Sequence, residues 1–102
     1  MQKRMYVIVR HDLKSKGYQA AQSGHALAQY MMEHKPHEKG HWENDYLIFL
    51  ETKNAHCLER IIRKLERKGF SYSKFHEPDL DGQLTAIAAL DVGHLVRNYR
   101  TL

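Results

Sequence analysis

Apolar residues occur along the chain in two kinds of pattern, which predict different elements. Residues 5–10, 46–50 and 84–90 are short, nearly continuous apolar runs, which is typical of strands covered on both faces. Residues 70–75, in which aromatic and polar side chains partly alternate, indicate a further strand. The chain therefore predicts four strands.

Residues 17–33 have the spacing of a helix, with Ser15 as its expected N-cap. Small and apolar side chains at steps of three and four predict an inner face made of Ala20, Ala21, Gly24, Leu27, Ala28 and Met31. A polar stripe opposite contains Tyr18, Gln22, His25 and Gln29. Such a small inner face lets a helix lie close to the sheet that it covers.

A second amphipathic helix follows the strand at 46–50. Thr52 or Asn54 is its expected cap, it reaches about Lys68, and Gly69 is a natural end. Its apolar face consists of Leu58, Ile61, Ile62 and Leu65. After an acidic turn at 77–82, residues 93–100 are expected to form a short terminal helix. The element order βαβαββα predicts an α/β fold with helices packed on a mixed sheet.

Length and composition indicate one globular domain spanning residues 1–102. Apolar residues make up 42% and charged residues 27% of the chain, which is ordinary globular usage. Cys57 is the only cysteine, so no intrachain disulfide is possible. This cysteine content is consistent with a protein of a reducing compartment. The apolar run before Arg10 is far too short for a signal sequence or a membrane span. We therefore expect a cytoplasmic protein with no membrane association.

The net charge of +4 is concentrated near the N-terminus. Residues 1–20 contain five lysines and arginines and one acid, whereas the rest of the chain holds equal numbers of basic and acidic residues. A local positive field suits a partner that carries phosphate groups. The alternative is that these charges only favour solubility.

Residues 10–17 connect the first strand to the first helix, which is a common place for a ligand. Crevices at the carboxyl ends of strands bind ligands in open α/β sheets, and free N–H groups at a helix start favour anions. His25 lies one turn from Gln22 on the polar stripe and is expected to face the same side of the molecule as the loop that contains Arg10 and Lys16. The alternatives are an ordinary hydrophilic loop and a histidine that serves only nearby backbone groups.

Several common chemistries are disfavoured. The chain has no Gly-x-Ser-x-Gly elbow, phosphate-binding P-loop or dinucleotide-binding glycine pattern. His34, His37 and His41 are close in sequence, but no second ligand cluster accompanies them, and Cys57 has no cysteine partner. We expect neither a metal ion nor another cofactor.

The strand, loop and helix at the N-terminus resemble the signature of the type 2 peptidyl-tRNA hydrolases. The family pattern is approximately Arg-x-Asp-Leu, Lys-Gly-Lys and Ala-Ala-Gln-x-x-His-Ala; the corresponding residues are Arg10, Asp12, Leu13, Lys16, Gly17, Ala20, Ala21, Gln22, His25 and Ala26. Trp42 and the strand at 84–88 agree in order with later family features. The resemblance covers residues 5–90, although only the first third carries a distinctive motif.

This resemblance implies a three-layer α/β/α fold with a mixed four-stranded sheet, and metal-free hydrolysis of the ester between a peptide and the 3′ end of tRNA. It implies a tRNA partner and allows a homodimer. The implied catalytic residues are Lys16, His25, Asp12, Glu77 and Thr85, with Asp79 and Asp81 as alternatives to Glu77. The implied substrate-binding residues are Arg10, Lys14, Gly17, Tyr18 and Gln22.

Three departures from the family pattern leave a second function open. The later family motif Asp-Ala-Gly-x-Thr is not present as such, so that Glu77, Asp79 and Asp81 compete for the acidic role in a shortened turn. Tyr18 stands where the pattern has its second lysine, and the chain is one residue shorter between Leu13 and Lys16. Tyrosine cannot supply the positive charge of a lysine. The alternative function is therefore a non-catalytic module of the same fold that binds tRNA or an acidic partner.

Overall fold

A single mixed sheet forms the centre of the molecule in the computed structural model, which describes residues 2–102. Its strand order is β3-β4-β1-β2-β5. β1 and β2 are parallel, and the other neighbouring strands are antiparallel. The strands are β1 (Arg4–Arg10), β2 (Tyr46–Thr52), β3 (Tyr72–Glu77), β4 (Gln83–Leu90) and β5 (Arg100–Thr101).

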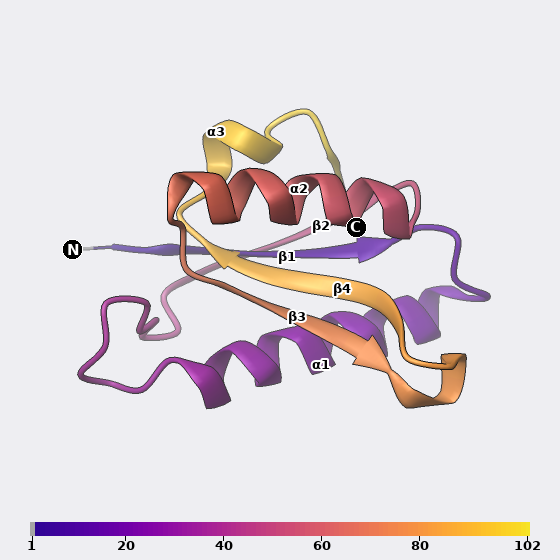
Figure 1. Cartoon of the computed structure of the whole chain (residues 1–102), viewed down its shortest axis with the longest axis horizontal. Helices are drawn as coiled ribbons and strands as arrows, with labels where there is room; N and C mark the ends of the chain where they lie inside the picture. Colours follow the sequence, from indigo (N-terminus) through magenta and orange to yellow (C-terminus); the bar gives the residue numbers. More distant parts are fainter. Residues whose placement is uncertain (1) are drawn as a thin grey trace.

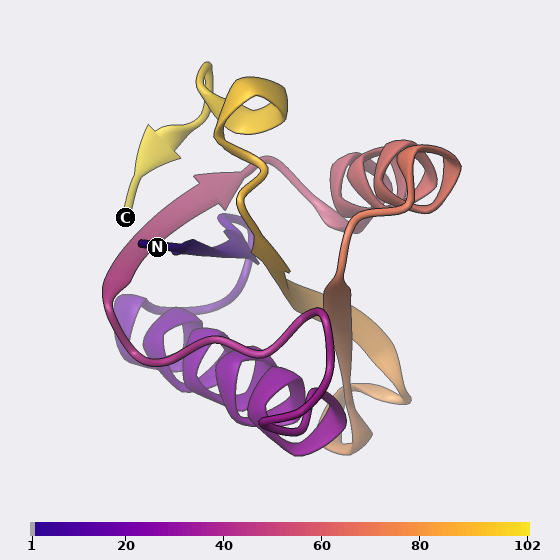
Figure 2. The same cartoon turned by 90° about the vertical axis from the view of Figure 1, so that its left-hand side faces the viewer.

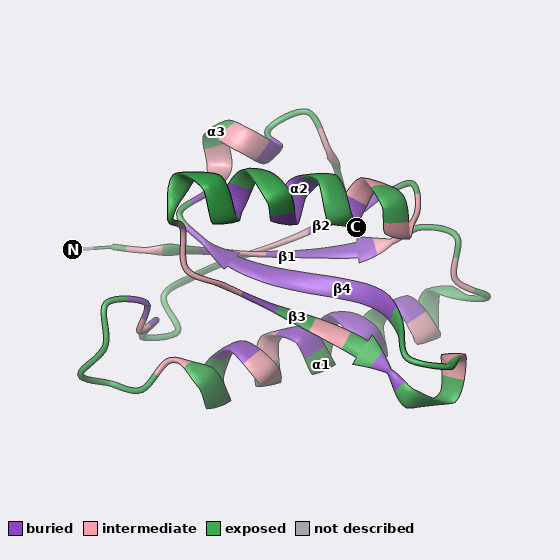
Figure 3. Ribbon diagram, viewed as in Figure 1, coloured by how far each residue is buried: buried purple, intermediate pink, exposed green. Residues whose placement is uncertain are grey.

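Helices cover both faces of this sheet, as Figures 1 and 2 show. α1 (Lys16–Glu33) lies on one face, and α2 (Ala55–Lys68) and α3 (Gly93–Val96) lie on the other. A short 3-10 helix, η1 (Pro78–Leu80), connects β3 to β4. Each face has its own apolar core, and β1 and β4 are buried between them (Figure 3). The chain is therefore α/β with three layers.

The prediction of four strands in the order βαβαββα was wrong at the C-terminus. The helix expected over 93–100 ends at Val96, and residues 100–101 form a fifth strand. These residues pair with Leu50 and Glu51, and the Leu102 amide donates to the Phe49 carbonyl. The open edge of β2 thus supplies backbone partners that an isolated terminal helix lacks.

The third strand begins at Tyr72, two residues later than predicted, and it continues to Glu77. Phe70 belongs to the end of α2 instead, because its amide donates to the carbonyl of Leu65. Gly69 adopts the left-handed conformation, with φ of 76°, that lets a helix end in this way. The strand also ends two residues later than predicted, so that Glu77 is its last residue.

The predicted helix starts are confirmed. The Ser15 hydroxyl accepts a hydrogen bond from the Tyr18 amide at 3.1 Å, and the Asn54 side chain accepts one from the Cys57 amide at 3.1 Å. Both side chains satisfy an amide that has no partner within its helix. The Ser15 cap fixes where α1 begins after the basic loop, residues 11–15.

Removing the Ser15 cap should weaken the fold measurably. We expect Ser15→Ala to lower the free energy of unfolding by about 1 kcal/mol, because the Tyr18 amide loses its acceptor. Urea denaturation monitored by circular dichroism measures this change, with Ser15→Asp as a matched variant that keeps an acceptor. Equal stability of all three proteins would show that the cap contributes nothing.

The predicted inner face of α1 was wrong. Ala20, Ala21, Gly24, Ala28 and Met31 are exposed, and the buried side chains of the helix are those of Gln19, Gln22, Ser23, Ala26 and Tyr30. The two glutamines and the serine are buried because each makes an internal hydrogen bond. Hydrophobic spacing alone does not reveal such a polar inner face, which brings Gln22 against the sheet.

Candidate active site

A buried chain of three polar side chains connects α1 to the β3–β4 hairpin. The Thr85 hydroxyl donates to Oε1 of Gln22 at 2.5 Å, and Nε2 of Gln22 donates to Oε1 of Glu77 at 2.7 Å. Gln22 is 1% exposed, Thr85 is fully buried, and Glu77 is 8% exposed. Since the carboxylate can only accept, the Gln22 amide has a single orientation between its two partners.

Glu77 is an ionised carboxylate at neutral pH. Its pKa lies below the ordinary value because the Gln22 side chain and the Asp79 amide donate hydrogen bonds to it, and the charge of His25 acts in the same direction against the cost of burial. The Asp79 amide lies 3.0 Å from Oε2. A fixed negative charge therefore lies at one end of this chain of polar side chains.

The lowered pKa of Glu77 predicts a pH-dependent contribution to stability. An unfolded chain takes up the Glu77 proton near the ordinary value of 4.5, before the folded chain does. Ionised Glu77 therefore stabilises the fold above that pH, and this stabilisation disappears as the pH falls through the lower folded pKa. The stability difference between the wild type and Glu77→Gln should be constant from neutral pH to about pH 5 and change below about pH 4.5. Urea denaturation across that range measures it; a difference that does not depend on pH would contradict the assignment.

His25 lies at the solvent-exposed end of the polar chain. Its ring stacks on Phe75 of β3, with ring centroids 4.6 Å apart. It follows Gln22 by three residues on α1, and its charge helps to lower the pKa of Glu77. A titratable group accessible to a ligand thus stands beside a buried negative charge.

Tyr18 and Lys14 form the neighbouring part of the rim. Partial burial raises the pKa of Tyr18, and the charges of Glu77 and Asp79 add to this effect. The ammonium of Lys14 lies 4.8 Å from the centre of the Tyr18 ring, which is a cation–π geometry. A positive charge is therefore present at Tyr18, although tyrosine itself has none.

Arg10 and Asp12 form a clamp at the end of β1. The guanidinium donates to both carboxylate oxygens of Asp12, at 2.8 and 3.0 Å, and also to the Gln83 side chain and the Leu84 carbonyl. The hydrogen bonds from Arg10 keep the pKa of Asp12 below its ordinary value. The clamp holds the basic loop against β4, one residue from Thr85.

Lys16 interacts with a different group of residues. Its ammonium lies 3.5 Å from Oε2 of Glu51, and Nδ1 of His11 lies 3.4 Å from the same oxygen. The Lys16 side chain is 72% exposed. Gly17 is also exposed, in the first turn of α1. Of the predicted residues, the structure brings together Gln22, Glu77, Thr85 and His25, with Tyr18 and Lys14 nearby, whereas the contact made by Lys16 runs to Glu51.

The three acidic residues of the turn differ in whether they contact Gln22. Asp79 and Asp81 are exposed, and Asp81 has the left-handed backbone that closes the turn, with φ of 54°. Glu77, the last residue of β3, is the one whose carboxylate meets Gln22. The family resemblance could not separate these residues, because the acidic turn here departs from the family spacing.

Sequence reasoning missed Glu51, a buried acid among basic groups. Burial opposes its ionisation, but the charge of Lys16 and the neighbouring His11 outweigh that cost, so its pKa lies below the ordinary value. Arg100 approaches the other carboxylate oxygen at 3.8 Å. The available signal was an acidic residue directly after the buried run at 46–50.

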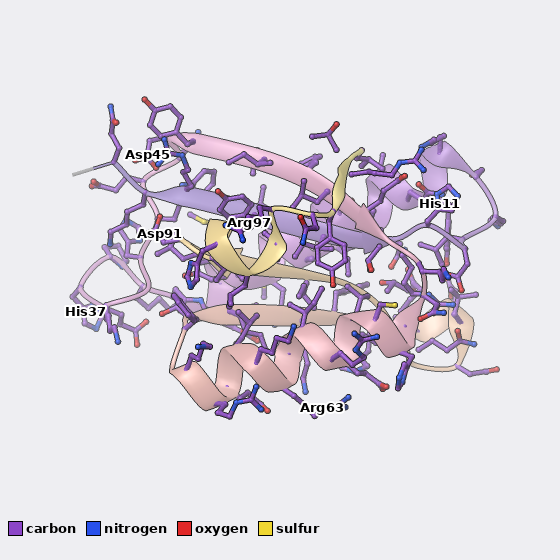
Figure 4. The ribbon with its side chains drawn as sticks, turned by 90° about the horizontal axis from the view of Figure 1, so that it is seen from above. His11, His37, Asp45, Arg63, Asp91 and Arg97 are labelled. Carbon is purple, nitrogen blue, oxygen red and sulfur yellow. The ribbon has the colours of Figure 1, made fainter. Side chains whose placement is uncertain are left out.

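The histidine-rich loop lies far from this site. Figure 4 places His11 and His37 at opposite ends of the molecule, and His34 stacks on Tyr30. Within residues 2–102, no three side chains of the metal-binding types gather as they would around an ion. Over the same residues, no helix is long and apolar enough to cross a bilayer.

Comparisons with known proteins were made for the sequence and for the fold. A family model described as "Peptidyl-tRNA hydrolase PTH2" matches residues 3–91. None of the curated proteins searched matches the chain. A solved structure, titled as a protein of unknown function from Agrobacterium tumefaciens strain C58, has a TM-score of 0.73 and 10% identity over 100% of this chain and 98% of that one. At that identity the likeness is one of fold alone.

Proposed function

Because the chain belongs to the peptidyl-tRNA hydrolase PTH2 family, we propose that it hydrolyses the ester joining a peptide to the 3′ end of tRNA. The observation that carries the proposal is the buried chain Thr85–Gln22–Glu77, which ends beside the exposed ring of His25. All four residues lie within the matched range. A translation enzyme of this kind would act in the cytoplasm.

The proposed chemistry uses water as the nucleophile. A bond forms between the water oxygen and the ester carbonyl carbon, and the bond from that carbon to the 3′ oxygen breaks. His25 takes the water proton and later gives one to the departing 3′ oxygen, while ionised Glu77 stabilises the charge that His25 gains. Gln22 and the fully buried Thr85 keep Glu77 in position, so Thr85 acts as a positioning residue.

The basic side chains around this centre are proposed to hold the substrate. Lys16, whose exposed side chain must leave Glu51 to reach this centre, stabilises negative charge, either on the terminal phosphate or on the oxyanion formed during hydrolysis. Lys14, carried over the Tyr18 ring, supplies a cation where the family pattern has its second lysine. Arg10 holds Asp12 and the loop that ends at Gly17, so that the start of α1 faces the ligand.

Release of the N-acetylated amino acid, which stands for the peptide, from an N-acetylated aminoacyl-tRNA tests this proposal. The purified protein should release the peptide at the same rate with and without a metal chelator, because the residues above supply the proposed chemistry. A chelator-sensitive rate would show that a metal ion takes part. Release no faster than in buffer would contradict the proposed activity.

A second candidate, a non-catalytic module that binds tRNA, is favoured by one observation. Glu51 lies within ion-pairing distance of Lys16 and so offsets the charge that catalysis requires. Binding through phosphate contacts should weaken steeply as salt rises. Salt-dependent tRNA binding without hydrolysis would support this module, whereas binding together with hydrolysis supports the enzyme.

A further inference from the structure

Three basic side chains from separate segments share the single carboxylate of Glu51. The Lys16 ammonium and Nδ1 of His11 lie 3.5 and 3.4 Å from its Oε2, and Arg100 of β5 lies 3.8 Å from its Oε1. Glu51 itself is buried in β2, between Val9 of β1 and Arg100 of β5. The carboxylate therefore has more basic neighbours than it needs to balance its charge, and one of them can leave without stranding a buried charge.

Lys16 is held by charge and not by an oriented hydrogen bond. Its distance of 3.5 Å from Oε2 exceeds the usual range for an N–H donor to an oxygen. That oxygen accepts no hydrogen bond that satisfies the normal geometry within residues 2–102. The Lys16 side chain is 72% exposed, so it can turn through solvent without moving the core. A stronger anionic partner can therefore replace Glu51.

Glu51 supplies the attraction that the start of α1 lacks. The free amide groups at a helix start repel a cation, and the first turn of α1, residues 16–19, contains no acidic residue. Asp12, four residues before Lys16, is already bound through both carboxylate oxygens to Arg10. The position of Lys16 on the β2 side thus depends on the charge of Glu51.

We propose that Glu51 is a positioning residue that competes with the substrate for Lys16. In the free protein it holds the ammonium on the β2 side, and an anionic group of the bound tRNA takes its place. This assignment rests on the proposed function, in which Lys16 meets negative charge on the substrate. Because only molecules with a released Lys16 bind fully, the apparent affinity is reduced by the fraction that is released.

A cavity beside Glu51 lowers the cost of the exchange. It has a volume of about 370 Å³, and His11, Glu51 and Arg100 are among the residues that line it. A space of this size holds several water molecules, which can donate to Oε2 once Lys16 has left. His11 and Arg100 stay at the carboxylate meanwhile, so the buried charge remains compensated.

Binding of deacylated tRNA tests the competition in four proteins: the wild type, Glu51→Gln, Lys16→Ala and the double variant. We expect Glu51→Gln to bind about tenfold more tightly than the wild type, as it would if Lys16 were released in about a tenth of wild-type molecules. The double variant should bind within about twofold of Lys16→Ala, because it has no lysine to release. Fluorescence anisotropy at one fixed salt concentration measures these affinities.

Glu59→Gln is the matched control, because it removes the same charge from the exposed side of α2. It should bind within about twofold of the wild type, since exposed distant charges are screened. If circular dichroism shows Glu51→Gln unfolded, Glu51→Asp provides the test: it draws the carboxylate back by one methylene and should still bind more tightly than the wild type. An unchanged affinity in the folded Glu51 variant would overturn the proposal, as would an equal gain in Glu59→Gln or in the absence of Lys16.

Kinetics separate this role from a purely structural one. In the hydrolysis assay, Glu51→Gln should lower KM by about tenfold and leave kcat within about twofold of the wild-type value, because the released lysine contributes equally to the bound state and the transition state. A residue that only supported the fold would lower kcat when replaced and would not improve KM. An unchanged or higher KM would therefore contradict the competition.

Failure of this proposal is separable from failure of the proposed function. Tighter tRNA binding by Glu51→Gln that depends on Lys16, without hydrolysis, would support the competition and remove the enzyme. Hydrolysis with equal KM values in the wild type and Glu51→Gln would leave the enzyme and remove the competition.

Discussion

Replacing Glu77 with glutamine is expected to lower the rate of peptide release by about 100-fold or more, while the protein stays folded. The effect is large because the carboxylate stabilises the charge that His25 gains when it takes the water proton. The fold should survive, because the Gln22 amide can rotate by half a turn. It would then accept from the new amide and donate to the Thr85 hydroxyl. The measurement is the release rate from N-acetylated aminoacyl-tRNA at neutral pH, with circular dichroism to confirm folding.

Asp81→Asn is the matched control for this substitution. It removes a carboxylate from the same turn, and asparagine tolerates the left-handed backbone that Asp81 adopts. Because Asp81 is exposed and Glu77 is the acid of this turn whose carboxylate contacts Gln22, the control should keep the wild-type rate. A folded Glu77→Gln variant with the wild-type rate would contradict the role of Glu77. Equal losses in both variants would show that the rate follows the net charge of the turn.

Replacing Lys16 with alanine should abolish measurable release, which corresponds to a loss of about 100-fold or more. Its ammonium is the cation proposed to balance negative charge on the substrate, and alanine provides none. The Lys16 side chain is 72% exposed, and His11 and Arg100 still face the buried Glu51 carboxylate when Lys16 is replaced. The protein should therefore remain folded, so that the loss is one of activity.

Lys64→Ala tests whether the loss is specific to this position. Lys64 lies on the exposed side of α2, and its replacement removes the same charge from the molecule as a whole. We expect the Lys64 variant to release peptide at the wild-type rate and Lys16→Arg to retain part of the activity. Wild-type activity in Lys16→Ala would remove Lys16 from the site.

The helices were predictable from the sequence to the extent that their determinants are local. Ser15, Asn54 and Gly69 act within a few residues of their own positions, and each was confirmed as a helix boundary. β5 was not predictable, because residues 100–101 become a strand only when the distant edge of β2 is available. A two-residue strand carries no pattern of its own.

The prediction of the inner face of α1 was wrong for a related reason. Its small and apolar residues suggested a core, yet the structure buries Gln19, Gln22 and Ser23. A buried glutamine is stable only if its partners are supplied by other segments, and Gln22 finds them 55 and 63 residues away. Spacing along one helix contains no information about those partners.

The sequence named residues for a candidate site but did not predict which of them the fold groups together. The motif pointed to Gln22, His25, Glu77 and Thr85, which the structure joins, and to Lys16, whose contact is with Glu51 instead. Glu51 was missed because a single acid at the end of a strand resembles an ordinary surface residue. Only the fold shows that it is buried among three basic side chains.

The central claim is that the Thr85–Gln22–Glu77 chain and His25 make this protein a catalyst of ester hydrolysis. Its most direct test is the amount of peptide released when N-acetylated aminoacyl-tRNA is in large excess over the protein. The account predicts many equivalents of peptide per protein molecule, because the site is regenerated after each hydrolysis. Release that matches the buffer rate, with or without bound tRNA, would contradict it.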